Sequence, residues 1–248
     1  MKQFFVRIGI LVTAVVGMVA CSKNDNDQPG PTHMRWVNVV PNLSFDIYSN
    51  GTLIVPKLPF DSLTSYASGL PSFYNLQIAK YGTSDTLVNG RQQLQSGLYY
   101  SMFLLPDTTG GQINANKVTI ATVTENTFAP SVDTCKIRFF NFAPYTPPID
   151  VVISKDGRTR PSDTLRPFSR RIYNDQSVSS SYTTYYQMFA SNLKINLYND
   201  IDSSLIRTIP WTFDSRGVYT IYLKPVPGKS GKDTFDFSVL KSTTGIQL

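Results

Sequence analysis

Hydrophobic and polar residues alternate along most of the chain after residue 34, which is the pattern of half-buried β-strands. The runs are short and rich in β-branched and aromatic residues, and none becomes a sustained apolar stripe with the 3.6-residue period of a helix. Short strands at this spacing predict an all-β fold made of β-sandwiches. The expected strands are 35–40, 45–49, 98–105, 117–124, 136–142, 149–154, 193–198, 218–224 and 235–240.

The strand pattern occurs twice in the same order. Residues 35–41 (RWVNVVP) realign with residues 138–144 (RFFNFAP), and a strand with a central aspartate follows each segment, at Asp46 and at Asp150. The shared asparagine and proline favour the end of a strand, because asparagine bonds nearby backbone and proline lacks a ladder donor. Asp46 and Asp150 stand between apolar neighbours, so we expect them to face outward or to bond a neighbouring loop.

The duplication continues downstream. Tyr99 and Tyr219, each two residues after a glycine, suit a tyrosine corner, in which a phenol bonds adjacent backbone. We predict two tandem immunoglobulin-like β-sandwich domains, at 34–128 and 133–248, joined by a short linker. The aligned segments are LQIAKY from Leu76 with LKINLY from Leu193, GLYYSM from Gly97 with GVYTIY from Gly217, and VTIATV (118–123) with FDFSVL (235–240).

These motifs carry a family resemblance. The order R-x-x-N-x-x-P, then a strand with a central aspartate and a turn glycine, then G-x-Y, resembles domain-of-unknown-function family 4397. The resemblance covers roughly residues 34–124 and 136–240 and is weaker in the middle of the second copy. It implies β-sandwich domains, often in tandem, in exported bacterial proteins. It implies no activity, because the shared residues are turn and packing residues.

A different pattern occupies the N-terminus. A basic start precedes the apolar stretch 8–20, whose helix of about 20 Å is too short for the ~30 Å hydrocarbon core. This layout predicts a secretory signal over residues 1–20. The segment MVAC (18–21) resembles the lipobox of bacterial lipoproteins, which implies cleavage before Cys21 and a lipid on its sulfur. The alternative is an ordinary signal peptide followed by a chance cysteine.

Residues 21–33 are expected to form a flexible tether, because Ser22–Thr32 contains no apolar residue that could pack a core. Acidic residues this close to a lipidated cysteine resemble the export tag of surface lipoproteins in Bacteroidota-type Gram-negative bacteria. That resemblance implies an outer-membrane protein exposed on the cell surface. The alternative is a hydrophilic spacer on a periplasm-facing lipoprotein.

Composition excludes several classes of function. Of the 23 basic residues, Lys2 and Arg7 leave with the signal, so 21 remain against 17 acidic residues, a net +4. That charge is scattered, so nucleic acid is not an expected partner. With Cys21 lipidated, only Cys135 remains, so no intrachain disulfide is expected. The one histidine, His33, falls in the tether, which excludes a Ser-His or Cys-His pair and a histidine-rich zinc site from the globular part. No cofactor or metal is predicted, although Asp-rich loops could hold Ca²⁺ incidentally.

Aromatic residues are the first candidates for a binding site. Exposed coplanar rings stack on sugars, whereas buried rings would only pack the core and the cross-strand neighbours. The alternative, packing, therefore stays open for each ring. The candidate glycan-stacking residues are Trp36, Tyr182, Tyr185, Tyr186 and Trp211.

Aspartate followed by serine or threonine recurs four times. The triplets resemble the O-glycosylation acceptor of the same bacterial group, and the alternative is a set of Asx- or ST-type turns at strand ends. The candidate acceptors are Ser62, Thr86, Thr108 and Thr164.

Together these features favour a non-enzymatic, lipid-anchored cell-envelope protein that acts as a binding, adhesion or structural module. One alternative is a glycan-binding accessory lipoprotein of a polysaccharide-uptake system. Another is an Asp-dependent glycan hydrolase, which would need two carboxylates about 5–10 Å apart in a deep cleft. The expected partners are the membrane, through the lipid on Cys21, and glycans or other envelope proteins.

Overall fold

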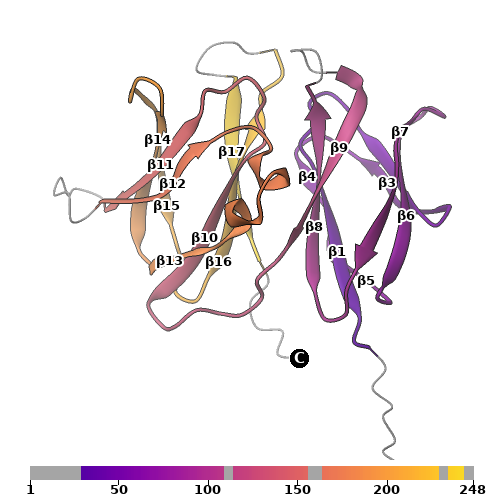
Figure 1. The fold of residues 1–248 in the computed structure, drawn as a ribbon, viewed down its shortest axis with the longest axis horizontal. Coiled ribbons are helices and arrows are strands. Elements are labelled where there is room, and N and C mark those ends of the chain that lie inside the picture. The colour runs from indigo at the N-terminus through magenta and orange to yellow at the C-terminus, as the bar shows by residue number, and fades with distance from the viewer. Residues whose placement is uncertain (1–28, 109–113, 156–163, 229–233, 243–248) are drawn as a thin grey trace, which may run out of the picture. The chain divides into compact units, whose positions relative to one another are not determined.

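The computed structural model describes residues 29–108, 114–155, 164–228 and 234–242. By their contacts, Pro31–Leu248 form one compact unit, separate from Met1–Gly30. Its described residues form β-strands and two short 3₁₀ helices, η2 (Asp175–Ser177) and η3 (Ser180–Thr183), which confirms the all-β prediction (Figure 1). No helix in the described ranges is long and apolar enough to cross a membrane.

The first half of the unit consists of two facing sheets. One has the order β4-β1-β8-β9, with β5 also paired to β1, and the other has the order β3-β2-β6-β7. β1 runs parallel to β8, whereas the other pairs are antiparallel. The strands are β1 (Thr32–Asn38), β2 (Phe45–Ser49), β3 (Thr52–Leu58), β4 (Ser62–Leu63), β5 (Ala67–Gly69), β6 (Ser72–Lys80), β7 (Thr86–Leu94), β8 (Tyr99–Asp107) and β9 (Asn114–Thr124).

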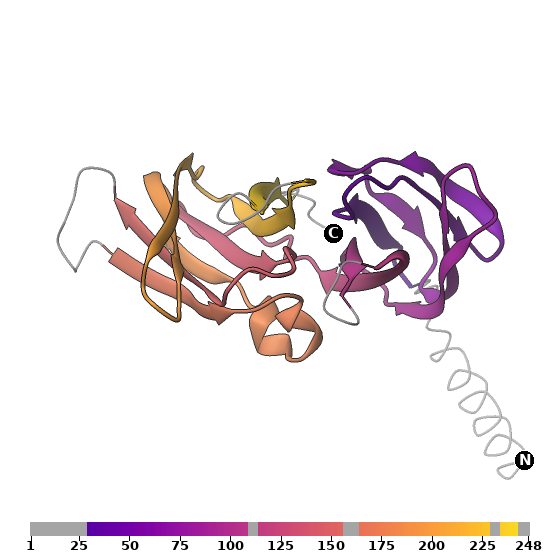
Figure 2. The ribbon, with the colours of Figure 1, turned by 90° about the horizontal axis from the view of Figure 1, so that it is seen from above.

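The second half repeats this arrangement (Figures 1 and 2). A sheet of order β13-β10-β16-β17 faces a sheet of order β12-β11-β14-β15, and β10 runs parallel to β16 as β1 does to β8. The strands are β10 (Thr134–Asn141), β11 (Ile149–Lys155), β12 (Thr164–Arg171), β13 (Tyr186–Phe189), β14 (Asn192–Asn199), β15 (Leu205–Thr212), β16 (Val218–Pro225) and β17 (Phe235–Lys241).

Each half has a core between its own sheets, and a third core joins the halves. Because side chains alternate along a strand, β8 sends Met102 into the first core and Phe103 to its opposite face. There the Phe103 ring meets Phe142, at 4.7 Å between ring centroids, and Tyr222, at 5.4 Å. The unit is therefore two sandwiches that share a packed interface, and the domain boundaries 34–128 and 133–248 stay a prediction.

The repeated asparagine ends its strand as predicted. Asn38 Nδ2 donates to the carbonyl oxygens of Leu43 at 2.9 Å and Leu58 at 3.0 Å, and its Oδ1 accepts from the Val40 amide at 2.8 Å. In the second copy Asn141 Nδ2 donates to the Thr146 hydroxyl at 2.8 Å and to the Arg171 carbonyl at 3.3 Å, and its Oδ1 accepts from the Ala143 amide at 3.1 Å. These buried bonds fix the path of the chain out of β1 and β10.

The repeated aspartates bond neighbouring backbone, which confirms their structural role. Asp46 accepts from the Lys57 amide and Asp150 accepts from the Arg170 amide, both at 2.9 Å. Lys57 and Arg170 have φ angles of 47° and 52°, in the left-handed region, where each hairpin is irregular. Each carboxylate thus stabilises a bulge.

The repeat alignment predicted for the middle strands is wrong by two residues. Ile47, which follows Asp46, faces Ile78, whereas Val151, which follows Asp150, faces Leu197. Ile78 therefore corresponds to Leu197 and not to Ile195. Both candidate partners are aliphatic and two residues apart, so the pattern of side chains alone cannot choose between them.

The tyrosine corner is formed by Tyr100 and not by Tyr99. Tyr100 Oη accepts from the Gln95 amide at 3.1 Å, and Tyr219 Oη accepts from the Asp214 amide at 2.9 Å. The glycines aligned in sequence are thus one residue out of structural register. Tyr99 points to the opposite face of β8 and stacks on the histidine ring of β1.

Candidate functional site

A buried charged cluster lies where the two halves meet. Glu125, the only glutamate of the chain, follows β9, and its side chain is fully buried. Its carboxylate is 3.3 Å from Arg35 Nη2 and 2.9 Å from Arg138 Nη2. These arginines open the two repeated motifs, so one carboxylate pairs with the equivalent cation of both copies.

Three hydroxyls complete the shell around this carboxylate. Ser101 Oγ donates to Glu125 Oε1 at 2.5 Å, while Ser242 Oγ and Tyr185 Oη donate to Oε2 at 2.8 and 2.9 Å. Burial alone would raise the pKa of Glu125, but the two arginines and the hydroxyl donors outweigh it and hold the pKa below its ordinary value. The carboxylate is saturated and out of reach of solvent, so its role is structural.

The cluster follows the internal repeat in detail. The Arg35 guanidinium lies 4.6 Å from the ring centroid of Tyr66, and that of Arg138 lies 4.5 Å from the ring of Tyr185. The two tyrosines are as far apart in sequence as the two tyrosine-corner residues (185 − 66 = 219 − 100 = 119). Each copy therefore brings one arginine to the shared carboxylate and places one tyrosine ring against that arginine, and Tyr185 also bonds the carboxylate.

Three of the five predicted aromatic residues line one hollow in the second copy. Tyr182 of η3 and Tyr186 of β13 are each 37% exposed, and Tyr185 between them is half-buried because its hydroxyl donates to Glu125. The hollow has a volume of about 260 Å³. Its remaining lining residues are Pro167, Phe168, Ser169, Arg171, Ser181 and Thr184, and we call it the tyrosine hollow.

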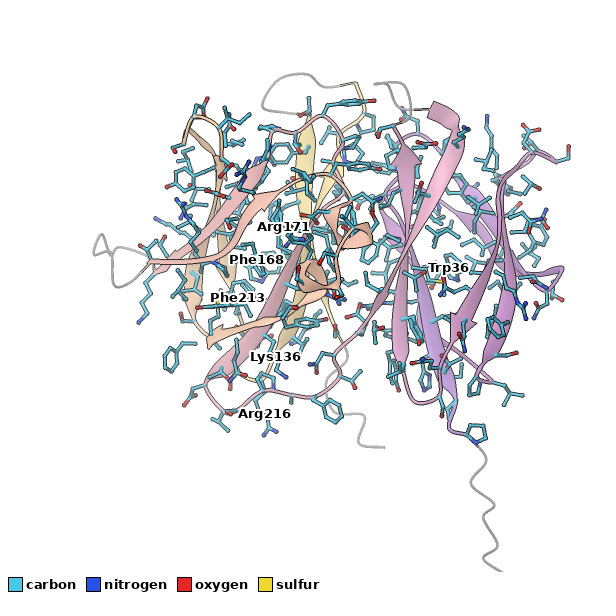
Figure 3. The ribbon with its side chains drawn as sticks, in the orientation of Figure 1. Trp36, Lys136, Phe168, Arg171, Phe213 and Arg216 are labelled. Carbon is cyan, nitrogen blue, oxygen red and sulfur yellow. The ribbon has the colours of Figure 1, made fainter. Side chains whose placement is uncertain are left out.

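A buried ion pair supports this hollow. Arg171 and Phe168 both come from β12 and lie close together, with the guanidinium 5.9 Å from the centroid of the Phe168 ring (Figure 3). Arg171 is 2% exposed, and its Nε and Nη2 bind the Asp175 carboxylate at 2.6 and 2.8 Å. Its Nη2 also donates to the Tyr182 carbonyl at 3.2 Å, and its guanidinium lies 4.9 Å from the Tyr182 ring. Asp175 neutralises this cation, so the pair holds Tyr182 in place without giving the hollow a net charge.

The prediction that Trp36 stacks on a glycan is wrong, and Trp211 lies outside the tyrosine hollow. Trp36 is 1% exposed, inside the first core, because it lies on the inner face of β1 (Figure 3). It cannot stack on a sugar. Trp211 is half-buried, edge-to-face with Phe237 at 6.1 Å, and lines a separate hollow of about 480 Å³ with Asn192, Leu193, Pro210 and Thr212.

The candidate O-glycosylation residues occupy different environments. Ser62 Oγ is partly buried and donates to the Pro59 carbonyl at 2.5 Å, as in an ST-type turn. Thr86 and Thr164 are exposed at the starts of β7 and β12, and Thr108 is half-buried after β8. Their modification stays a prediction.

His33 lies in the sandwich and not in the tether, since β1 begins at Thr32. Its Nδ1 is 2.9 Å from Ser68 Oγ, and its ring stacks on Tyr99 at 4.1 Å between centroids. The exclusion of a Ser-His pair from the globular part is therefore wrong. The hydrophobic pattern predicted a strand from residue 35, whereas β1 begins at Thr32 and includes the histidine. Ser68 faces His33 in the register of β5 on β1, and neither residue lines a hollow named above.

Carboxylates are absent from the hollows. Neither the tyrosine hollow nor the hollow beside Trp211 has aspartate or glutamate in its lining, and no three His, Cys, Asp or Glu side chains gather anywhere in the described ranges. Cys135 is fully buried, and burial raises the pKa of its thiol to about 11. Cys21 and the predicted signal 1–20 lie outside the described residues.

Comparison with known proteins gives a family and a distant likeness. Residues 32–152 match the model of the family described as Domain of unknown function (DUF4397). No curated protein matches the chain. The carbohydrate-binding module CBMbc (family CBM26) of Eubacterium rectale Amy13K, solved with maltoheptaose, is 9% identical, covers 86% of this chain and 97% of its own, and has a TM-score of 0.24. A candidate cell adhesion protein from Parabacteroides distasonis is 6% identical, covers 86% and 98%, and has a TM-score of 0.22.

Proposed function

Residues 32–152 of the chain belong to the DUF4397 family, and we propose that the protein is a lipid-anchored, non-catalytic module of the cell envelope that binds glycans at the tyrosine hollow. The observation that carries the proposal is the gathering of Tyr182, Tyr185 and Tyr186 around one hollow of about 260 Å³. The hollow is concave and mixes aromatic with polar lining, as small-ligand sites do.

The lining suits sugars in particular. The apolar faces of Tyr182 and Tyr186 are partly exposed, and such rings offer flat surfaces on which the C–H faces of a pyranose can stack. Hydroxyls from Ser169, Ser181 and Thr184 line the same hollow and can exchange hydrogen bonds with sugar hydroxyls. The only cation in the lining, Arg171, is already paired, which favours neutral glycans over acidic ones.

A glycan array followed by calorimetry on the strongest neutral hit tests this proposal. Tyr182→Ala and Tyr186→Ala should each weaken binding roughly tenfold, which is the loss of about 1.4 kcal/mol of ring contact. Tyr81→Ala is the matched control, because Tyr81 is 46% exposed in the first copy and lies outside the hollow. Tyr185 is left intact, since its hydroxyl belongs to the buried cluster. Equal loss in the control, or no glycan bound by the wild-type protein, contradicts the proposal.

The anchor is a second, separable part of the proposal. It is supported by the lipobox-like MVAC segment that ends at Cys21, and the acidic stretch after it favours the outer membrane and exposure at the cell surface. Cys21→Ala should release the protein from the membrane fraction, because the acyl chains would be missing. Cys135→Ala, the other cysteine, should leave it there. A Cys21→Ala protein that stays in the membrane fraction contradicts the anchor and leaves glycan binding untouched.

A further inference from the structure

Another hollow opens at one end of the second sandwich, near the edge strands β12 and β13 of its two sheets. It has a volume of about 250 Å³ and shares no lining residue with the tyrosine hollow. We call it the β12–β13 pocket. It is lined by Ile153, Ser154, Lys155, Leu165, Met188, Phe189, Ser191 and Leu193.

The wall of this pocket is a continuation of the hydrophobic core. Ile153, Met188 and Leu193 belong to the buried core cluster of the second copy. Phe189 is 73% exposed and Leu165 is 37% exposed, so large apolar side chains also stand in solvent beside the opening. An apolar ligand would therefore cover surface that is in contact with water in the protein alone.

Two polar groups accompany this apolar wall. Ser191 is in the lining, and its Oγ is buried without a hydrogen-bond partner among the described residues, which is unfavourable. Lys155, at the end of β11, is exposed and brings a positive charge to the lining. Ser154 Oγ already accepts from Asn196 Nδ2 at 3.1 Å. An apolar body with one anionic oxygen-bearing end matches this lining.

The first copy closes the corresponding place with its own side chain. Gly69 and Tyr74 occupy the positions of Met188 and Leu193 (188 − 69 = 193 − 74 = 119). Tyr74 packs against the first core and its hydroxyl donates to the Leu70 carbonyl at 2.6 Å, so close to Gly69 that a side chain there would collide with it. The same framework is thus filled by a phenol in one copy and hollow in the other.

We propose that the β12–β13 pocket binds a medium-chain carboxylic acid. The alkyl chain lies against Ile153, Met188 and Leu193 and is covered by Phe189, and the carboxylate meets the Lys155 ammonium and the Ser191 hydroxyl. This site is independent of glycan binding, because the two hollows are lined by different residues.

Calorimetry with decanoate and with uncharged 1-decanol tests the site. The protein is the full mature chain carrying Cys21→Ala, so that no acyl group of its own competes. Decanoate should bind with a stoichiometry of one, and Phe189→Ser should weaken it about fivefold or more. Leu70→Ser is the matched control, because Leu70 is 74% exposed at the equivalent position of the first copy, and it should change nothing. Lys155→Gln should weaken decanoate about threefold to tenfold and leave decanol unchanged.

A filled pocket gives the decisive comparison. The double variant Met188→Gly, Leu193→Tyr installs the pair of the first copy, and its thermal unfolding shows whether it is folded. A folded double variant should lose decanoate binding, and retained binding would overturn the proposal. Failure of the wild-type protein to bind decanoate, or an equal loss in Leu70→Ser, would overturn it too. Vesicles of dioleoyl phosphatidylglycerol are the second probe, and binding to them without binding to decanoate would assign the surface to membrane lipid instead.

Discussion

Replacing Glu125 by glutamine keeps the size of the side chain and removes its charge from the interface between the two sandwiches. In the native protein its carboxylate faces five groups: it accepts hydrogen bonds from Arg35 and from three hydroxyls, and it forms an ion pair with Arg138. A glutamine amide has one acceptor oxygen, which can accept from two donors. Its NH₂ group is itself a donor and would face the guanidinium or hydroxyl donors that the second carboxylate oxygen now accepts from. Most of the five would therefore lose their partner.

The expected loss of stability is large because the cations stay buried. Arg35 is 4% exposed and Arg138 is 0% exposed, so solvent cannot take the place of the missing charge. Breaking a buried ion pair by removing one partner costs about 3–5 kcal/mol. Against a total free energy of unfolding of about 5–15 kcal/mol, this is a large fraction. For a chain of this size it corresponds to a fall in Tm of roughly 6–20 °C.

Urea unfolding followed by circular dichroism and by tryptophan fluorescence measures this loss. The matched control is Asp214→Asn, which removes an exposed carboxylate that pairs with Lys241 and accepts from Tyr219 Oη, and it should lower the urea midpoint far less than Glu125→Gln does. If Glu125→Gln unfolds within 1 kcal/mol of the wild-type protein, the buried cluster does not stabilise the interface, and the reasoning about it fails.

Three further predictions follow from the same structure. The pKa of Glu125 is lowered in the folded protein, so the stability that its carboxylate contributes is complete above about pH 4.5 and is lost as the pH falls through the folded pKa. The urea concentration at the unfolding midpoint of the wild-type protein should therefore decrease when the pH is lowered below about 4.5. Glu125→Gln should lack this part of the pH dependence. Tyr100→Phe and Tyr219→Phe should each cost about 1 kcal/mol in urea unfolding, since each loses the hydroxyl bonded to a backbone amide, and Tyr99→Phe should cost less. The intact mass of the native protein should exceed polypeptide plus lipid and should fall when Ser62, Thr86, Thr108 and Thr164 are all replaced by alanine; a mass equal to polypeptide plus lipid contradicts O-glycosylation.

The strand content could be predicted because β-branched and aromatic runs with turn residues between them are a local property of the chain. The partner of each face could not. The run LYYSMFLL of β8 is apolar without alternation, and all of its residues from Tyr99 to Leu105 are buried, because one face packs in the first core and the other against the second sandwich. A strand buried on both faces has no polar side that identifies its outer face. Trp36 lies on β1, which is also buried on both faces, so the sequence could not assign its ring to the core side.

The site was partly visible in the sequence. The aromatic cluster from Tyr182 to Tyr186 is local, and the structure brings those rings to one hollow. The role of the repeated arginines was missed, although both stand at the head of the repeat and the chain has a single glutamate. Residues 35, 125 and 138 meet only through the pairing of whole sheets, so no local pattern connects them.

The shared carboxylate also links the tyrosine hollow of the second copy to the first copy. Arg35 and Glu125 come from the first sandwich and Arg138 comes from the second, so the buried cation of the second copy is paired with a carboxylate of the first. Tyr185, which lines the hollow, donates its hydroxyl to the same carboxylate and lies over the Arg138 guanidinium. Its ring is therefore held by one contact within the second copy and by one hydrogen bond that exists only when both copies are packed together. A ring fixed in this way loses little conformational freedom when a ligand stacks on it, which is the condition under which a small aromatic surface binds well.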